Sequence, residues 1–217
     1  MFFQDVKTRY KKLLIILLPI FIIFLVLVFF ILRSLASISG TVSNSKEKRI
    51  DSMNYTLRYN ATDYQIELFK ELEEAVEEGD GLKISEAIAK NYVADTYTFT
   101  NKESKWDVGG MCYVYSKHNN SIYYGIRDSL YQLFEMIIEK YGREGLIEVM
   151  QVNVSSSNKA SELFEVDGKQ FEAYNVGCSV QIDGPDGIVG AITHNVYFTI
   201  INNIEKNRYE IVELYGD

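Results

Sequence analysis

Among the side chains of this sequence, that of His194 is well suited to proton transfer, because histidine changes its charge near neutral pH. Alternation along an expected strand places His194 on the same face as Ile192 and Val196. Tyr174 and Cys178 share one face of the neighbouring strand, so they could line a pocket with His194 and act in acid–base chemistry. No Asp or Glu falls on that apolar face, so we expect His194 to be a hydrogen-bonded core residue. An enzyme or small-ligand pocket around His194 is the alternative.

The sequence contains two cysteines, Cys112 and Cys178, and two histidines, His118 and His194. Two cysteines are too few for a disulfide framework, although they could pair in an oxidising compartment. Each lies among apolar residues, where a free cysteine behaves as a small hydrophobic side chain. We therefore expect free thiols, with a Cys112–Cys178 disulfide as the alternative. Without a CxxC or HExxH motif we expect no metal site, and no motif implies a cofactor.

The segment Asp107-Val108-Gly109-Gly110 is the least generic loop of the chain. Paired glycines allow positive φ or close backbone approach, and an aspartate commonly caps such a turn. The segment does not match the GxxxxGK[ST] loop that cradles phosphates. We expect it to turn the chain from a pair of helices into a short strand over residues 111–115. The alternative is that Asp107, Gly109 and Gly110 belong to a partner-binding surface.

Four tyrosines follow this loop: Tyr113, Tyr115, Tyr123 and Tyr124. Tyrosine supplies a large contact area at a small cost in side-chain entropy, so the four could bind a partner protein or a glycan. They could equally be half-buried residues where a short strand joins a helix. The sequence leaves both interpretations open.

The first part of the domain has the sequence patterns of helices. Thr62 and Gln65 match a capping box, and Gly79 ends the helix that they open. The other face of this helix is rich in glutamate, which we expect to be an ordinary solvated face and not a cation or partner site. Ser121 as N-cap and Gly142 as C-cap predict a long later helix. The expected helices cover residues 62–79, 82–99 and 121–142.

From Leu146 onward the apolar period changes from helical to alternating. Asp167-Gly168 is a tight-hairpin signal, and further turns follow at residues 183–187 and 205–207. Consecutive hairpins imply antiparallel pairing, so the sequence predicts an α+β fold with helices packed on a curved antiparallel sheet. The expected strands begin at residue 146 and continue over residues 163–166, 169–182, 188–201 and 209–214.

The composition argues against binding to nucleic acid. Residues 41–217 hold 17 Lys and Arg against 29 Asp and Glu, a formal net charge of −12. Binding to nucleic acid through its phosphates needs clustered positive charge, so we expect no nucleic-acid partner.

Residues 13–32 form an uncharged stretch whose one helix breaker is Pro19. About 20 helical residues span the hydrocarbon core of a bilayer, so we expect a single transmembrane helix from Leu13 to Leu32. Basic residues crowd its N-terminal flank, which predicts a cytoplasmic N-terminus and an extracytoplasmic domain. A cleaved signal peptide is the alternative, although the stretch is longer than the usual signal-peptide core. The expected divisions are a cytoplasmic tail (1–12), a transmembrane helix (13–32), a polar stalk (33–61) and an α+β domain (62–217).

Helices followed by a meander of long antiparallel strands resemble the nuclear transport factor 2-like superfamily. The anchor and stalk resemble the single-pass assembly proteins of type IV secretion and conjugation systems. The resemblance covers residues 62–217 in element order, together with the span at 13–32, and it rests on architecture. It implies a cone formed by helices on a curved sheet, a fold that hosts enzymes, binding modules and scaffolds alike. The segment Trp106-Asp107-Val108-Gly109-Gly110 before residues 111–115 is also similar to membrane-anchored proteins of low-GC Gram-positive bacteria.

These features together predict a non-enzymatic protein anchored in the cell membrane. Its extracytoplasmic domain is expected to contact other envelope proteins, or a second copy of itself, in a scaffold like those of secretion and conjugation systems.

Overall fold

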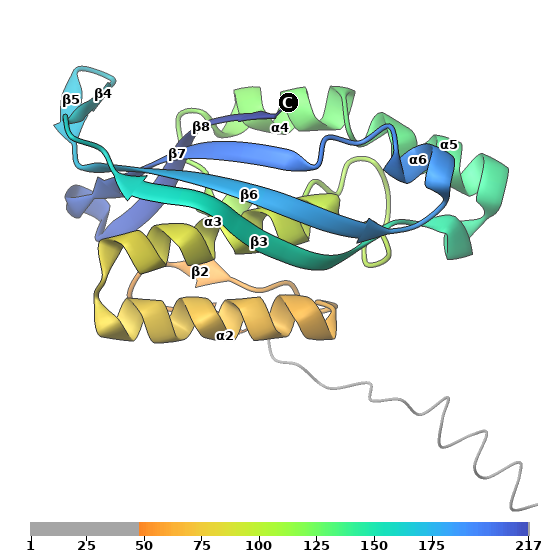
Figure 1. Ribbon diagram of the computed structural model, residues 1–217, viewed down its shortest axis with the longest axis horizontal. Coiled ribbons are helices and arrows are strands. Elements are labelled where there is room, and N and C mark those ends of the chain that lie inside the picture. The colour runs from red at the N-terminus through yellow and green to blue at the C-terminus, as the bar shows by residue number, and fades with distance from the viewer. Residues whose placement is uncertain (1–47, 217) are drawn as a thin grey trace, which may run out of the picture. The chain divides into compact units, whose positions relative to one another are not determined.

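The computed structural model, which describes residues 48–216, starts its first long helix where the sequence predicts (Figure 1). Thr62 and Gln65 form the expected capping box at the start of α2 (Asp63–Glu78). Gly79 ends this helix with a φ of 73°, a conformation that glycine adopts without strain. Asp80 then caps α3 (Gly81–Tyr97), since its carboxylate accepts from the backbone of the first turn.

The remaining elements follow in chain order. The other helices are α4 (Asn119–Asp128), α5 (Gln132–Tyr141) and α6 (Asp186–Val189), with 3-10 turns η1 (Met111–Tyr113), η2 (Arg143–Gly145) and η3 (Ile204–Lys206). The strands are β1 (Arg49–Ile50), β2 (Tyr55–Thr56), β3 (Glu148–Lys159), β4 (Phe164–Val166), β5 (Lys169–Phe171), β6 (Ala173–Asp183), β7 (Asn195–Asn203) and β8 (Arg208–Gly216).

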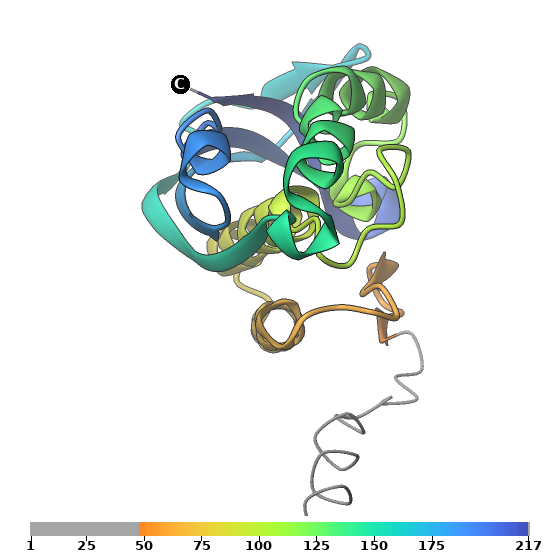
Figure 2. The same cartoon turned by 90° about the vertical axis from the view of Figure 1, so that its right-hand side faces the viewer.

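A curved four-stranded antiparallel sheet forms the centre of the domain, as predicted. Its strand order is β3-β6-β7-β8, and each neighbouring pair is antiparallel. Helix α3 lies against one face of this sheet, and α2 lies on the far side of α3 (Figure 2). The face toward α3 is closely packed, and its residues Val176, Phe198 and Ile200 are at most 2% exposed. The predicted α+β class with helices on a curved antiparallel sheet is therefore confirmed.

The long helix predicted over residues 121–142 is wrong, because the chain breaks it into α4 and α5. The Ser129 hydroxyl donates to the carbonyl of Gly125, and the following turn rotates the chain. This turn brings Tyr131 and Phe134 against Phe99, with ring centres 4.9 and 5.7 Å from that of Phe99. Burial of two aromatic rings thus outweighs the continuous helical pattern. Helix α4 also starts earlier than the predicted N-cap Ser121, while Gly142 does end α5.

Two of the predicted strands are shorter than expected. The Asp167-Gly168 turn joins β4 to β5 with positive φ at both positions, which confirms the hairpin. The strand predicted over 169–182 is divided at Glu172, because β5 pairs with β4 whereas β6 pairs with β3. The strand predicted from residue 188 starts only at Asn195, because residues 186–189 form α6 after Pro185.

The folded domain begins before the expected boundary at residue 62. The β1–β2 hairpin lies in the segment assigned to the stalk, yet its Tyr55 has no exposed surface. The Tyr55 hydroxyl donates to the carbonyl of Tyr209 over 2.7 Å, and its ring lies 5.4 Å from that of Tyr113. The β1–β2 hairpin is therefore part of the folded domain, and Ile50, Tyr55 and Leu57 belong to its core.

The expected membrane span at residues 13–32 and the tail at residues 1–12 lie outside the described residues. Within residues 48–216, none of the helices combines the length and the apolar character that a bilayer crossing requires.

Candidate functional site

His194 does not face a pocket with Tyr174 and Cys178. Its Nδ1 lies 3.0 Å from the carbonyl oxygen of Val180, and its Nε2 lies 3.0 Å from that of Val189. The partly exposed imidazole therefore links the backbone of β6 to α6, and neither ring nitrogen is directed at an open site. The expectation of a hydrogen-bonded histidine agrees with these contacts, although the residue lies just before β7 and not within a strand.

The interior residues of the expected pocket belong to the packed core. Tyr174 is 6% exposed and its ring lies 5.8 Å from that of Tyr209. Cys178 is 1% exposed on the sheet face toward α3, and burial raises the pKa of its thiol to about 12. The Cys112 Sγ lies 3.6 Å from the carbonyl of Thr56, and burial raises the pKa of this thiol to about 11. Both cysteines are free, so the alternative of a Cys112–Cys178 disulfide is not what this structure contains.

The four tyrosines do not form one surface. Tyr113 is 2% exposed, and its ring lies tilted against that of Tyr55 in the main core. Tyr115 belongs to a second, smaller core cluster, and its hydroxyl donates to Asp167 over 2.9 Å. Only Tyr123 and Tyr124, on α4, reach the solvent. The short strand expected over residues 111–115 is instead η1 followed by a single parallel bridge from Val114 to Ile211.

The second half of the loop over residues 103–110 is fixed by contacts with residues outside the loop. The Asp107 carboxylate receives two hydrogen bonds from Arg58, of 2.8 and 3.0 Å. The Gly109 N–H donates to the Tyr131 hydroxyl over 2.9 Å. The Gly110 N–H donates to Asp95 over 2.7 Å, and its φ of 77° requires glycine. Asp107, Gly109 and Gly110 therefore hold the loop in place, and their contacts are within the domain.

A balanced cluster of four charges lies beneath this loop: Arg58, Asp95, Lys102 and Asp107. The Lys102 side chain has no exposed surface, and its Nζ donates to Asp95 over 2.7 Å. Burial would raise the pKa of the Asp95 carboxyl, but Lys102 and Arg58 outweigh it and hold that pKa below its usual value. Burial also lowers the pKa of Lys102, which Asp95 opposes only in part. The sequence analysis missed Arg58 and Lys102, because no local pattern marks them as partners of Asp95.

On the outer side of the loop, Trp106 lies with Tyr123, Tyr124 and Arg127 of α4 in a group that we call the aromatic–arginine patch. The Arg127 side chain is 19% exposed and pairs with Asp128. Trp106 is 57% exposed and Tyr124 is 51% exposed. The Arg127 guanidinium carbon lies 4.9 Å from the Trp106 ring centre and 4.6 Å from that of Tyr124. The Tyr123 hydroxyl donates to the Trp106 carbonyl over 2.9 Å, which ties α4 to the loop. One exposed ring of the loop and one of α4 therefore lie against the same guanidinium group.

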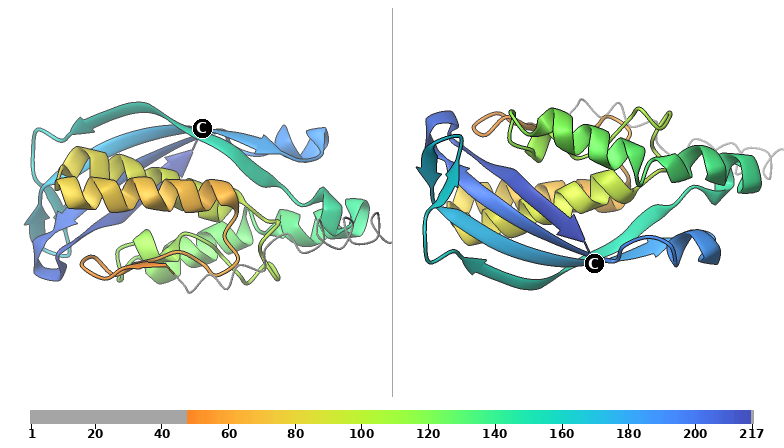
Figure 3. Two further views of the ribbon diagram at one scale, coloured as in Figure 1. Left: turned by 90° about the horizontal axis from the view of Figure 1, so that it is seen from below. Right: turned by 90° about the horizontal axis from the view of Figure 1, so that it is seen from above.

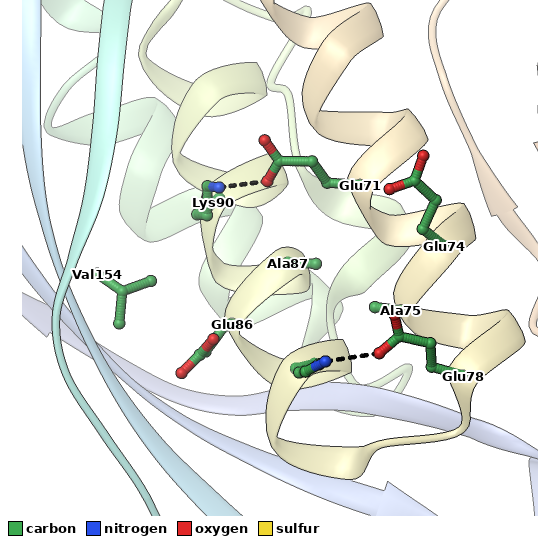
Figure 4. A pocket seen from close by; sticks show the side chains of 9 residues that line it. Glu71, Glu74, Ala75, Glu78, Glu86, Ala87, Lys90 and Val154 are labelled. Carbon is green, nitrogen blue, oxygen red and sulfur yellow. Dashed lines mark hydrogen bonds and ion pairs between the residues drawn. The ribbon is translucent and has the colours of Figure 1, made fainter.

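The glutamate-rich face of α2 forms one wall of a groove of about 210 Å³ between α2, α3 and β3 (Figure 4). Two ion pairs cross from helix to helix, Lys90 with Glu71 and Lys83 with Glu78. A third carboxylate, Glu86, accepts from the Ser157 hydroxyl. Among residues 48–216, no three Asp, Glu, His or Cys side chains come together as a metal site would require. These contacts fit the solvated face that the sequence predicts.

Comparisons of the chain with family models, with curated proteins and with solved structures find no match.

Proposed function

We propose that this chain is a non-enzymatic, single-pass membrane protein whose extracytoplasmic domain binds another protein of a cell-envelope assembly through the aromatic–arginine patch. The observation that carries the proposal is that the exposed rings of Trp106, on a fixed loop, and Tyr124, on α4, both lie against the Arg127 guanidinium. Tryptophan, tyrosine and arginine are the residues that contribute most often to binding energy at protein interfaces.

The rigidity of the patch supports this assignment. A side chain that is already ordered loses little conformational entropy when a partner binds. Asp107 is clamped by Arg58, and Tyr123 ties α4 to the carbonyl of Trp106. Both supports of the patch are thus in place before a partner arrives.

The membrane anchor is part of the same proposal. The uncharged stretch at residues 13–32 is long enough to cross a bilayer, and its basic N-terminal flank favours a cytoplasmic N-terminus. The order of the elements, helices before a curved antiparallel sheet, is compatible with a cone of the nuclear transport factor 2-like kind. Under this proposal the cone is filled by α3 and serves as a scaffold.

The enzyme alternative around His194 receives no support from the contacts. Both ring nitrogens of His194 lie against backbone carbonyls, and Cys178 is covered by α3. A general base needs a free nitrogen within reach of a substrate proton.

Site-specific photo-crosslinking in native membranes tests the proposal. A photoreactive amino acid replaces Tyr124 in the full chain, and a matched variant carries it at Ile204, which is 76% exposed in η3. We expect a discrete adduct with another envelope protein from position 124 and none of that mass from position 204. Recovery of monomer alone from position 124, or the same adduct from both positions, would count against the proposal.

A further inference from the structure

The outer face of the sheet, opposite α3, carries no helix over its middle within the described residues. Seen from above, the strands lie in front of α2 and α3, with the β4–β5 hairpin at one end and α6 at the other (Figure 3, right). The hairpin covers only its own end of the face, where it forms the small core cluster around Phe171 and Ile201. The middle of the outer face is therefore open to a ligand.

Two rows of residues cross this open face in register. The first, which we call the polar row, runs over all four strands as Asn158, Asn175, Thr199 and Glu213. The second, which we call the aromatic row, runs alongside it as Ser156, Gly177, Tyr197 and Tyr215. Paired residues of neighbouring strands point to the same face, so each row is a continuous line of side chains. Residues two apart along a strand are about 6.7 Å apart, so a ligand of two sugar rings can reach both rows.

The polar row is the floor of a groove of about 470 Å³. Residues 160–163, which connect β3 to β4, and Phe164 at the start of β4 line the groove together with the polar row. The Thr199 hydroxyl donates to the Glu213 carboxylate over 3.0 Å, which orients that carboxylate. The Asn175 side chain is exposed and makes no hydrogen bond within residues 48–216. An amide with a free donor and a free acceptor thus lies in the same row as an oriented carboxylate, with Thr199 between them.

The aromatic row provides a platform next to this groove. The Tyr197 and Tyr215 rings are stacked, with centres 5.4 Å apart and planes 18° apart, and Tyr215 is 61% exposed. Gly177, the neighbour of Tyr197 in the aromatic row, has no side chain that could cover the tyrosine rings. A Cβ at this position would come within 2.7 Å of the Ser156 Oγ and 3.0 Å of the Tyr197 ring. The outer surface of the tyrosine pair is therefore open for stacking.

The chemistry of the two rows selects one class of ligand. Glu162 and Glu213 line the groove, and the net charge of −12 over residues 41–217 disfavours any anion, including nucleic acid. An apolar ligand would desolvate Asn175 without a partner and would leave Glu213 with the Thr199 hydroxyl alone. A sugar presents hydroxyl groups at its edge and C–H groups on its face. The hydroxyl groups can hydrogen-bond amide and carboxylate groups, and the C–H face can pack on an aromatic ring. We propose that this face binds a neutral oligosaccharide, whose hydroxyl groups bond the polar row while a ring stacks on Tyr197 and Tyr215.

The test uses the full chain in lipid nanodiscs, since many detergents carry a sugar headgroup that would compete. The probes are maltotriose, cellotriose and the trimer of N-acetylglucosamine, each followed by saturation-transfer NMR. We expect at least one of them to bind with a millimolar or lower dissociation constant. Asn175→Ala and Tyr215→Ala should each weaken that binding by about tenfold, the loss expected for one good contact. Both residues are exposed, so the variants should keep the wild-type circular dichroism spectrum.

Trp106→Ala is the matched control, because it removes an exposed ring from the aromatic–arginine patch and leaves the sheet face intact. Its sugar binding should equal that of the wild type, which separates this inference from the proposed protein partner. Absence of binding by all three sugars at about 10 mM, well above a millimolar dissociation constant, overturns the inference. Binding that survives both Asn175→Ala and Tyr215→Ala overturns it as well. Binding of a Ser/Gly peptide that both variants abolish would assign the face to peptide chains instead.

Discussion

The ammonium group of Lys102 lies 2.7 Å from a carboxylate oxygen of Asp95, and the Lys102 side chain has no exposed surface. This contact joins the end of α3 to the loop that carries Trp106. Arg58 reaches both Asp95 and Asp107, so two cations and two carboxylates neutralise one another beneath the loop. A buried pair of this kind is expensive to leave half-formed, which makes the loop sensitive to single substitutions.

We expect Lys102→Met to lower the free energy of unfolding by about 3 kcal/mol, the lower end of the range for a broken buried pair, since Asp95 keeps some exposed surface. The loss arises because Arg58 alone must then neutralise Asp95 and Asp107. Urea unfolding of the full chain, followed by far-UV circular dichroism, measures the change. The control is Lys83→Met, which breaks the exposed pair with Glu78 and should leave stability nearly unchanged. Equal losses in the two variants would contradict the importance of burial.

Acid should destabilise the protein through Asp95. Its folded-state pKa lies below the usual value of 3.8, so its stabilising contribution is present above that value and is lost as pH falls through the lower, folded-state pKa. The Asp95→Asn variant cannot titrate, so its urea midpoint should fall less than that of the wild type between about pH 5 and pH 3. Parallel midpoints across this range would show that other carboxylates dominate acid unfolding.

Alkaline pH should destabilise the protein through Cys178. Burial raises the pKa of its thiol from 9.0 to about 12, so the stability it contributes is full below pH 9 and is lost as pH rises toward 12. Between pH 8 and pH 10 the loss from this one group is about 1.4 kcal/mol. Cys178→Ala should reduce the loss of stability between pH 8 and pH 10 by that amount, while removal of the sulfur lowers stability at every pH.

A thiol assay on the protein unfolded without reductant should find two free thiols. Finding none would indicate a disulfide between Cys112 and Cys178.

How far the sequence predicts this fold depends on how local each signal is. The capping box of Thr62 and Gln65 and the hairpin at Asp167-Gly168 were predictable, because each needs only a few adjacent residues. The break between α4 and α5 was not, because the helical pattern continues through it and the reason is burial of Tyr131 against a distant ring.

The candidate sites show the same limit. Arg58 lies 37 residues from Asp95, and although Lys102 is only seven residues from it, charges alone do not reveal which of them will lie together. The tyrosines were recognised as unusual, yet only the fold separates Tyr113 in the core from Tyr124 at the surface. Strand register, which aligns the polar row across the sheet, likewise depends on bulges in β3 and β8 pairing that no local motif predicts.

Gly110 and Gly125 should respond in opposite directions to replacement by alanine. At Gly110 the φ is 77°, and a Cβ would lie 2.6 Å from the Thr96 Oγ1, so Gly110→Ala should cost about 2 kcal/mol or more of stability. Gly125 lies within α4 with no atom near its Cβ position, so Gly125→Ala should stabilise by about 0.5–1 kcal/mol. Thermal unfolding of the two variants measures both signs. Similar shifts in both would show that the loop backbone relaxes freely.

The Arg127 side chain should contribute to partner binding through its planar shape as well as its charge. Its guanidinium lies over both the Trp106 and Tyr124 rings and donates two hydrogen bonds to Asp128. A lysine at this position would keep the positive charge but lacks a planar group. We therefore expect Arg127→Lys to reduce the crosslink from position 124 nearly as much as Trp106→Ala does, each by about tenfold. Ile204→Ala, on an exposed side chain away from the patch, should leave the yield unchanged. A crosslink that Arg127→Lys preserves and Arg127→Ala abolishes would mean that charge alone is recognised, and the stacked geometry would then have no part in binding.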